Sequence, residues 1–308
     1  MATPQWKTPP SVSPTIQQGS RKFVSVVKAN IDEIRQALIR TSLPSNPYLS
    51  AKTVVNVIDK TIVDLTHKAE GGWGDHPNDN GGPTMRGVIL ITFRGMFDTI
   101  FISTGITAVA NEAREFKKLG WYSGGKGSSG WETGKQVLYQ VCGDSDVASL
   151  FIYAFAASSS NRSPASIMST DPWLGLLMHQ AAWASGAGYW KQYKYGDIFT
   201  KYGWKSGTNV AAFVKGNSDK SGNIVGELLG QHANWITANT QPGMRLEPFR
   251  KGWLNRLVYT PSISWTHAIV GINSEIAKNS LTTDPKEQQY LKTKAAYYNQ
   301  LVINFPNL

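Results

Sequence analysis

Cysteine is almost absent from the sequence, and this scarcity excludes two kinds of stabilising site. Cys142 is the only cysteine among 308 residues, so the chain can form neither an internal disulfide nor a zinc site built from several cysteines. A nucleophilic thiol needs a base to deprotonate it, and the sequence places none beside Cys142. We therefore predict that Cys142 is a small buried residue of the core.

Long uninterrupted hydrophobic runs are also missing. The most apolar long segment, residues 87–110, contains Arg94 and Asp98, whose charges are costly inside a bilayer. This predicts buried helices and no membrane span. The N-terminal residues lack the apolar stretch of a signal peptide, so export by that route is not expected. Residues 1–20 hold four of the 15 prolines among Ser, Thr and Gln, a composition typical of an arm that does not fold alone.

Acidic side chains are the minority charge. The chain has 31 Lys and Arg against 21 Asp and Glu, and its net charge of +10 favours a polyanionic partner such as a cell-wall polymer, nucleic acid or a membrane surface. Residues 181–260 combine ten basic and four acidic side chains, a net charge of +6, with ten Trp or Tyr. Such a region suits stacking on sugars or single-stranded nucleic acid, and it equally suits a Trp-rich core with Lys outside.

Strand signals are sparse, and helical periodicity dominates. Apolar residues at helical spacing predict one helix over residues 21–43 and a second from the N-cap Ser50 to Glu70. The first of these helices is expected to lie outside the catalytic unit, because two prolines separate it from the second. Further helices are predicted over residues 88–101, 108–119, 149–157, 173–183, 224–239 and 284–301. The fold class is therefore mainly α, with little or no sheet.

Residues 70–87 combine the side chains that glycoside cleavage requires. A helix ends at two glycines after Glu70, and the following loop returns Asp79 and Thr84. Cleaving a glycosidic bond needs a carboxylic acid that stays protonated near neutral pH, and a second carboxylate that positions water or stabilises the cationic transition state. Trp73 is placed to give Glu70 an apolar wall, and Thr84 to hold a water against Asp79.

Each of these residues also has a structural interpretation. A glutamate at a helix C-terminus opposes the macrodipole, so a structural Glu70 would need a partner such as Arg86. Asp75 and Asp79 both suit Asx turns, and we prefer this role for Asp75. His76 has no second histidine at ligand spacing, and the order of a calcium-binding loop is missing, so we predict neither a metal nor a cofactor.

The same stretch resembles the glycoside hydrolase family 108 muramidases, which are lysozyme-like enzymes of phages and bacteria. Ten positions fall in register with the family hallmark: Glu70, Gly71, Gly72, Trp73, Pro77, Asp79, Gly81, Gly82, Thr84 and Gly87. Weaker similarity extends to residues 116–122, to residues 182–186 around Trp183 and to residues 249–256 around Trp253. The assignment of Trp183 competes with residues 155–160, and residues 1–49 lie outside the family pattern.

The resemblance implies a lysozyme-like domain and a muramidase activity. It divides the chain into an N-terminal arm and helix (residues 1–49), a catalytic domain (50–190), a peptidoglycan-binding region (191–262) and a C-terminal helical tail (263–308). Glu70 would be the catalytic acid, acting with Asp79 and Thr84. The residues expected to bind substrate are Trp73, Trp183, Tyr189 and Trp253.

Three rival hypotheses remain open at this point. A lytic transglycosylase needs only Glu70. A virion structural or ejected protein that keeps a lysozyme-like fold would contact other virion proteins through residues 1–49. Nucleic-acid binding rests on the +6 region alone and is the least favoured. For a phage muramidase, the expected location is the virion, or the host cytoplasm with later access to peptidoglycan in the cell wall.

Overall fold

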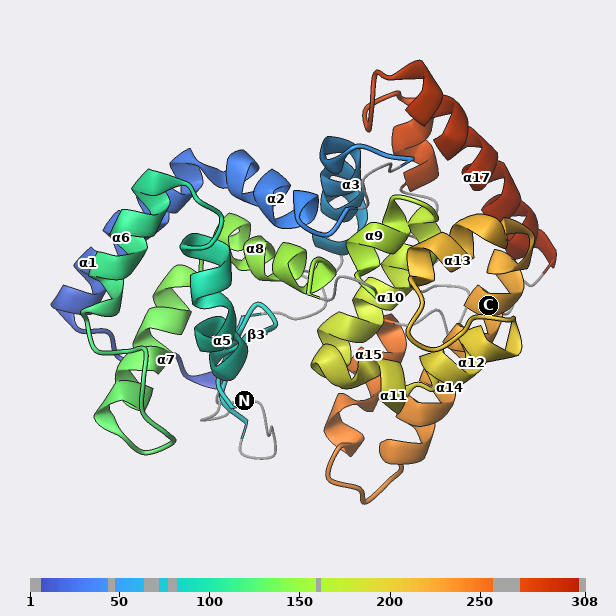
Figure 1. The fold of residues 1–308 in the computed structure, drawn as a ribbon. Helices are drawn as coiled ribbons and strands as arrows, with labels where there is room; N and C mark the ends of the chain where they lie inside the picture. Colours follow the sequence, from blue (N-terminus) through green and yellow to red (C-terminus); the bar gives the residue numbers. More distant parts are fainter. Residues whose placement is uncertain are drawn as a thin grey trace. The chain divides into compact units, whose positions relative to one another are not determined.

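The computed structural model describes residues 7–43, 48–63, 72–76, 82–158, 162–256 and 272–304, and these are mainly α-helical (Figure 1). The sequence prediction of a mainly helical chain with little sheet is thus confirmed. The chain forms two compact units, residues 1–38 with 66–154 and residues 39–65 with 155–308. The four domain boundaries predicted from the sequence stay a prediction.

The first unit begins with α1 (Pro14–Ala29), which starts earlier than the sequence analysis expected. Ser13 is the N-cap, its Oγ accepts a hydrogen bond from the Ile16 amide, and Pro14 occupies the first turn. Both are helix-start signals, so the expectation of an arm through residue 20 is wrong. The predicted helix over 21–43 is also divided: α1 ends at Ala29 with Asn30 as its C-cap, and α2 (Ile31–Arg40) follows.

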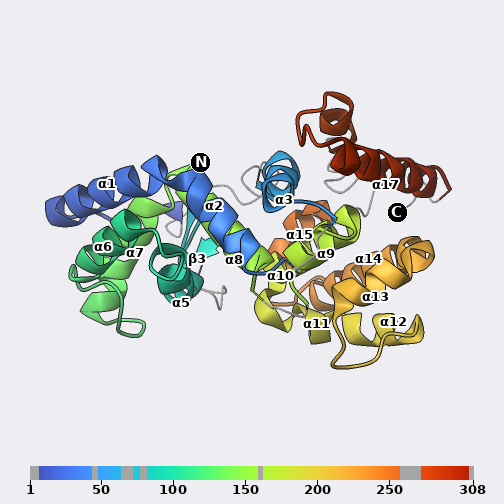
Figure 2. The same cartoon turned by 45° about the horizontal axis from the view of Figure 1, so that its top comes forward.

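Helix α1 is an integral part of the first unit. It packs against α6 (Thr107–Lys117) and α7 (Ser129–Val141), as Figures 1 and 2 both show. Phe23 of α1 is fully buried, with its ring stacked on Phe116 at 4.6 Å and set edge-on against Phe101 at 5.0 Å. The expectation that the first helix is an addition outside this unit is therefore wrong.

The rest of the first unit consists of short helices around that aromatic core. They are α5 (Leu90–Phe101), α6, α7 and α8 (Ser145–Ala156). Cys142 lies between α7 and α8 and is fully buried, as predicted. Burial raises the pKa of its thiol well above the ordinary value, so it remains protonated.

A small antiparallel sheet precedes α5. Strand β2 (Thr84–Met85) pairs with β1 (Trp73–Gly74) on one side and with β3 (Val88–Ile89) on the other. Arg86 and Gly87, which join β2 to β3, have φ angles of 49° and 80°. Two consecutive positive φ values are typical of the type I′ turn of tight hairpins. The helix predicted from Val88 accordingly begins only at Leu90.

The second unit is built around α10 (Pro172–Ser185), most of whose residues are buried. Ser50 caps α3 (Ala51–Ile58) as predicted, and a π-helical turn, η2 (Asp59–Val63), continues it. The remainder of the predicted helix, residues 64–70, lies outside the described residues. The other elements are α9 (Pro164–Met168), η3 (Gly186–Gly188), α11 (Tyr189–Gln192), α12 (Tyr195–Lys201), α13 (Val210–Gly216), η4 (Ser218–Lys220), α14 (Ser221–Asn239), η5 (Glu247–Phe249), α15 (Arg250–Arg256) and α17 (Pro285–Asn304).

The last helix, α17, packs into the second unit. Glu287 accepts hydrogen bonds from the backbone amide of Ser50 and from the hydroxyl of Thr53, so it anchors the start of α3. The Tyr298 hydroxyl donates to the buried carboxylate of Asp171 at 2.7 Å, at the N-cap of α10. Along the described parts of the chain, no helix combines the length and the hydropathy needed to cross a membrane.

Candidate active site

The structure describes part of the predicted site. Glu70 and Asp79 lie outside the described residues. Thr84 is half-buried in β2, and Trp73 is buried in β1. The other three predicted substrate contacts, Trp183, Tyr189 and Trp253, belong to the second unit.

The three-stranded sheet fixes the two described members of the site. Trp73 lies opposite Met85, and Thr84 lies opposite Gly74 on one side and Ile89 on the other. Side chains alternate between the faces of a strand, so Trp73 and Thr84 point to opposite faces of this sheet. Trp73 therefore packs inward while Thr84 is held on the other face.

One side of α7 supports this stretch. Lys135 and Tyr139 are four residues apart, so they lie on the same face of the helix. The rings of Trp73 and Tyr139 meet edge to face with their centroids 5.9 Å apart, and Nζ of Lys135 lies 3.1 Å from Oδ2 of Asp75. Asp75 thus has a structural role, as the sequence analysis preferred, although the partner is a lysine of another element.

Trp131, four residues before Lys135, completes this face. Gly82 has φ +75°, which strains a residue with a Cβ atom, and an added Cβ would also lie 3.3 Å from the Trp131 ring, so both features favour glycine there. The guanidinium of Arg94 lies over the same ring at 5.6 Å. This support was not predicted from the sequence, although Trp131, Lys135 and Tyr139 have the i, i+4 and i+8 spacing of one helix face.

Lys135 remains a cation near neutral pH. Burial lowers its pKa, but hydrogen bonds and attraction to Asp75 and Glu132 outweigh this effect, and the net pKa lies above the ordinary lysine value. The Lys135–Glu132 distance is 3.3 Å. Strand β1 and the adjacent Asp75 are thus attached to α7 by a ring contact and an ion pair.

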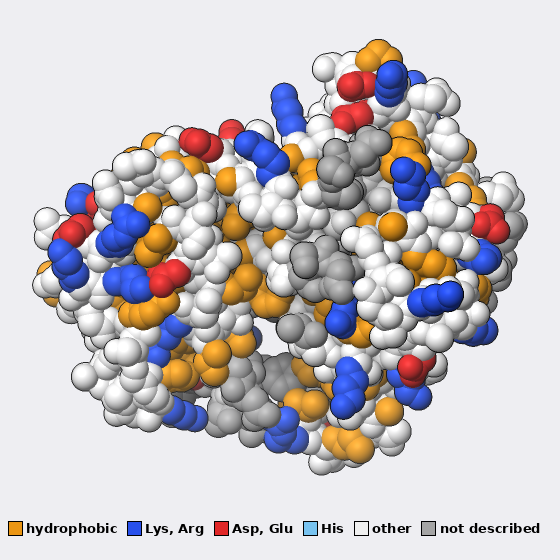
Figure 3. Space-filling view, viewed as in Figure 1, with side chains coloured by type: hydrophobic (Ala, Val, Ile, Leu, Met, Phe, Trp, Pro, Cys, Tyr) orange, Lys and Arg blue, Asp and Glu red, His pale blue; other side chains and the backbone are white. Residues whose placement is uncertain are grey.

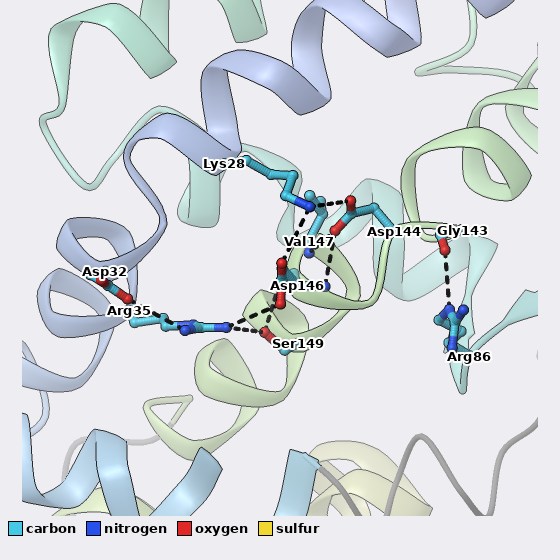
Figure 4. A network of polar contacts seen from close by, with 9 residues as sticks. All are labelled: Lys28, Asp32, Arg35, Arg86, Gly143, Asp144, Asp146, Val147 and Ser149. Carbon is cyan, nitrogen blue, oxygen red and sulfur yellow. Dashed lines mark hydrogen bonds and ion pairs between the residues drawn. The ribbon is translucent and has the colours of Figure 1, made fainter.

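A polar network connects the turn between β2 and β3 to the segment between α7 and α8 (Figure 4). Nε of Arg86 donates to the carbonyl oxygen of Gly143 at 3.2 Å. The next residue, Asp144, accepts hydrogen bonds from the amides of Asp146 and Val147 at 3.0 and 3.2 Å and so caps α8. The turn that follows Thr84 is therefore bonded to the start of a core helix.

The same network extends to the N-terminal helices. Lys28 of α1 lies 2.9 Å from Asp144 and 3.3 Å from Asp146, and its pKa is raised, chiefly by the hydrogen bond to Asp144. Arg35 of α2 reaches Ser149 at 3.3 Å and Asp146 at 3.8 Å. The first two helices thus contribute polar as well as apolar contacts to the frame of the site.

The predicted substrate contacts in the second unit are in mixed environments. Tyr189 is only 5% exposed, and its hydroxyl donates to the carbonyl oxygen of Arg162. Trp183 is half-buried with its ring edge-on to Phe155 at 5.3 Å, so the two competing assignments contact each other. Trp253 is half-buried and stacks with Trp235 at 6.1 Å. Their role in binding substrate stays a prediction.

Of the nine Trp and Tyr between residues 181 and 260 that the structure describes, four are buried, five are half-buried and none is exposed. Tyr193, Tyr195 and Trp204 are buried along with Tyr189. On the face drawn in Figure 3, Lys and Arg are scattered and do not form a single patch. These observations favour the Trp-rich core over the stacking surface. No set of three or more His, Cys, Asp or Glu within the described ranges is grouped to bind a metal.

Comparison with known proteins identifies one family. Searches of curated proteins and of solved structures found no match. The family model of Glycosyl hydrolase 108 matches residues 63–129, a segment that contains Glu70, Trp73, Asp79 and Thr84 and ends at the first residue of α7. These residues are similar to the glycosyl hydrolase 108 family, and the match supports a glycoside hydrolase domain in this part of the chain.

Proposed function

We propose that the protein is a peptidoglycan hydrolase that cleaves the glycan strand as an N-acetylmuramidase. The observation that carries the proposal is the family match over residues 63–129, which contains both candidate carboxylates and Thr84. The net charge of +10 agrees with an anionic cell-wall substrate.

In the proposed mechanism, Glu70 protonates the leaving glycosidic oxygen. Asp79 then positions the attacking water or stabilises the oxocarbenium-like transition state. The Thr84 hydroxyl makes no hydrogen bond with a described residue, so it is available to help Asp79 orient that water. The contacts of α7 and the Arg86 turn hold the strands on either side of the loop that carries Asp79.

Replacing Glu70 tests the assignment. Glu70→Gln keeps the shape of the side chain and removes its acid, so release of reducing ends from purified cell walls should fall by about 10²- to 10⁴-fold. Glu115→Gln is the matched control, because Glu115 is an exposed residue of α6 inside the same matched segment. Unchanged activity of Glu70→Gln, with circular dichroism equal to wild type, would refute the role of Glu70.

The products distinguish hydrolysis from a lytic transglycosylase reaction. Hydrolysis leaves reducing muramic acid ends, whereas a transglycosylase forms 1,6-anhydro ends and needs no second carboxylate. We expect reducing ends, and a large loss of rate in Asp79→Asn. Anhydro products with normal activity of Asp79→Asn would replace our proposal with the transglycosylase.

We further propose a phage setting, with access to the wall from the virion or from the host cytoplasm. The alternative of a virion structural protein can be tested by removing the N-terminal segment. Because Phe23 and Val27 are buried in the first unit, deletion of residues 1–49 would remove part of its core. Deletion of residues 1–12, which precede the α1 N-cap, leaves that core intact. Loss of co-sedimentation with virions in this variant, with hydrolysis unchanged, would support an attachment role for this segment.

A further inference from the structure

The second unit contains a pocket that the family match does not include. Its volume is about 460 Å³, and its lining includes Arg162, Trp190, Gly196, Asp197, Thr200 and Ser206. This volume lies within the range of small-molecule sites, roughly 300–1,000 Å³. All of these residues lie beyond residue 129, where the family match ends.

Trp190 forms a rigid wall of the pocket. Its indole stacks on Phe199 at 5.4 Å with nearly parallel planes, and the ring of Trp204 meets it at a steep angle at 5.6 Å. A Cβ atom on Gly196 would lie 2.9 Å from Nε1 of Trp190. Glycine at this position therefore leaves room beside the N–H edge of the indole, within the pocket.

Arg162 brings a positive charge to this wall. The guanidinium carbon lies 5.1 Å from the centre of the Trp190 ring, a cation–π contact that orients the group. Nε of Arg162 is buried and makes no hydrogen bond, and no carboxylate among the described residues pairs with the guanidinium. A guanidinium that no carboxylate neutralises is available to an anionic group in the pocket that it lines.

Asp197 brings the opposite charge. It lies in the first turn of α12, is exposed, and forms no ion pair or hydrogen bond with any residue that the structure describes. The pocket thus contains one cation and one anion that form no ion pair with each other or with another residue that the structure describes. A neutral sugar could hydrogen-bond to both side chains but would neutralise neither charge, and a simple anion would leave Asp197 without a cationic partner.

We propose that this pocket binds an amino-acid group that carries both a carboxylate and an ammonium. The carboxylate accepts hydrogen bonds from Arg162, the ammonium donates to Asp197, and the aliphatic part lies along Trp190. In peptidoglycan the matching chemistry is a peptide stem whose diamino acid is diaminopimelic acid, because its side-chain end carries both groups on one carbon. Naming the stem as the ligand rests on the proposed hydrolase function.

Calorimetric titration of the full-length protein with a soluble muropeptide tests this inference. One probe has a stem with a free amine and free carboxylates, and the second is the same molecule with its amine acetylated. Wild type should bind the free-amine probe at least about tenfold more tightly than the acetylated one, as expected when a charge-assisted hydrogen bond is lost. Asp197→Asn should bind both probes equally and weakly, and Arg162→Gln should weaken both.

Two variants serve as controls for charge and folding. Lys191→Gln removes an exposed cation next to Trp190 in sequence, and Asp219→Asn removes an exposed anion of the same unit; neither residue lines the pocket. Both should bind like wild type. Equal affinity of wild type for the two probes, or of wild type and Asp197→Asn for the free-amine probe, would overturn the inference.

The experiment also separates this inference from the proposed function. Muropeptide binding requires no turnover, so selective binding without Glu70-dependent release of reducing ends would refute the hydrolase and leave the pocket assignment standing. Cell-wall hydrolysis that depends on Glu70, without selective binding, would refute the pocket assignment alone.

Discussion

Substitution of Arg86 tests how the turn after Thr84 is held. Arg86 has φ 49°, a conformation that costs a residue with a Cβ atom about 1–2 kcal/mol. Its Nε donates to the carbonyl oxygen of Gly143, and such a charged donor contributes about 1.5–3 kcal/mol. The strain and the hydrogen bond therefore oppose each other, and two variants separate them.

Arg86→Ala removes the hydrogen bond and keeps the strain, whereas Arg86→Gly removes both. The greater freedom of glycine in the unfolded chain offsets about 0.4–1 kcal/mol of the relief. Arg86→Gly should therefore be more stable locally than Arg86→Ala by about 0.5–1 kcal/mol, and wild type should be more stable than either.

Native-state hydrogen exchange, followed by mass spectrometry on peptides covering residues 82–101, measures this local stability. The amides of the strands and of Leu90, which donates to the Pro83 carbonyl oxygen, should exchange about two- to fivefold faster in Arg86→Ala than in Arg86→Gly. Slower exchange in Arg86→Gly than in wild type would show that the bond to Gly143 contributes less than the relief of backbone strain. Equal exchange in the two variants would refute the argument from backbone strain.

Three further predictions concern the same frame. Asp144→Ala should destabilise α8 by about 1 kcal/mol in urea unfolding because its N-cap is lost, while Asp144→Asn should retain most of the cap. Gly82→Ala, at φ +75°, should slow cell-wall clearing and speed exchange of the hairpin, whereas Gly95→Ala, with open space at its Cβ inside a helix, should do neither. Lys135 has a raised pKa in the folded protein, so its ion pair with Asp75 stabilises the fold fully below the ordinary lysine pKa of 10.5. This stabilisation is lost as the pH rises through the raised pKa. In urea unfolding, wild type should therefore exceed Lys135→Met in stability by less at pH 11 than at pH 8.

Local sequence signals predicted which helices this protein forms better than they predicted the residues at which the helices begin and end. The N-cap at Ser50 and the burial of Cys142 follow from short-range chemistry, and both are confirmed. The start of α1 was missed although Ser13 and Pro14 are ordinary start signals, because the proline-rich composition of the preceding residues suggested an arm. The brief strand at Val88 was also missed, since two residues are too few to show alternation.

The sequence by itself determined the helical class, and residues 70–87 and their register with a glycoside hydrolase family indicated the candidate chemistry. Only the tertiary structure decided what surrounds them. It placed Phe23 of α1 in the core of the first unit, set Lys135 and Tyr139 of α7 against β1 and the loop that follows it, and joined the Arg86 turn to α8. The physical reason is that these contacts join residues far apart in the chain: spacing along one helix can reveal a face, as for Lys135 and Tyr139, but it does not reveal which distant segment that face contacts.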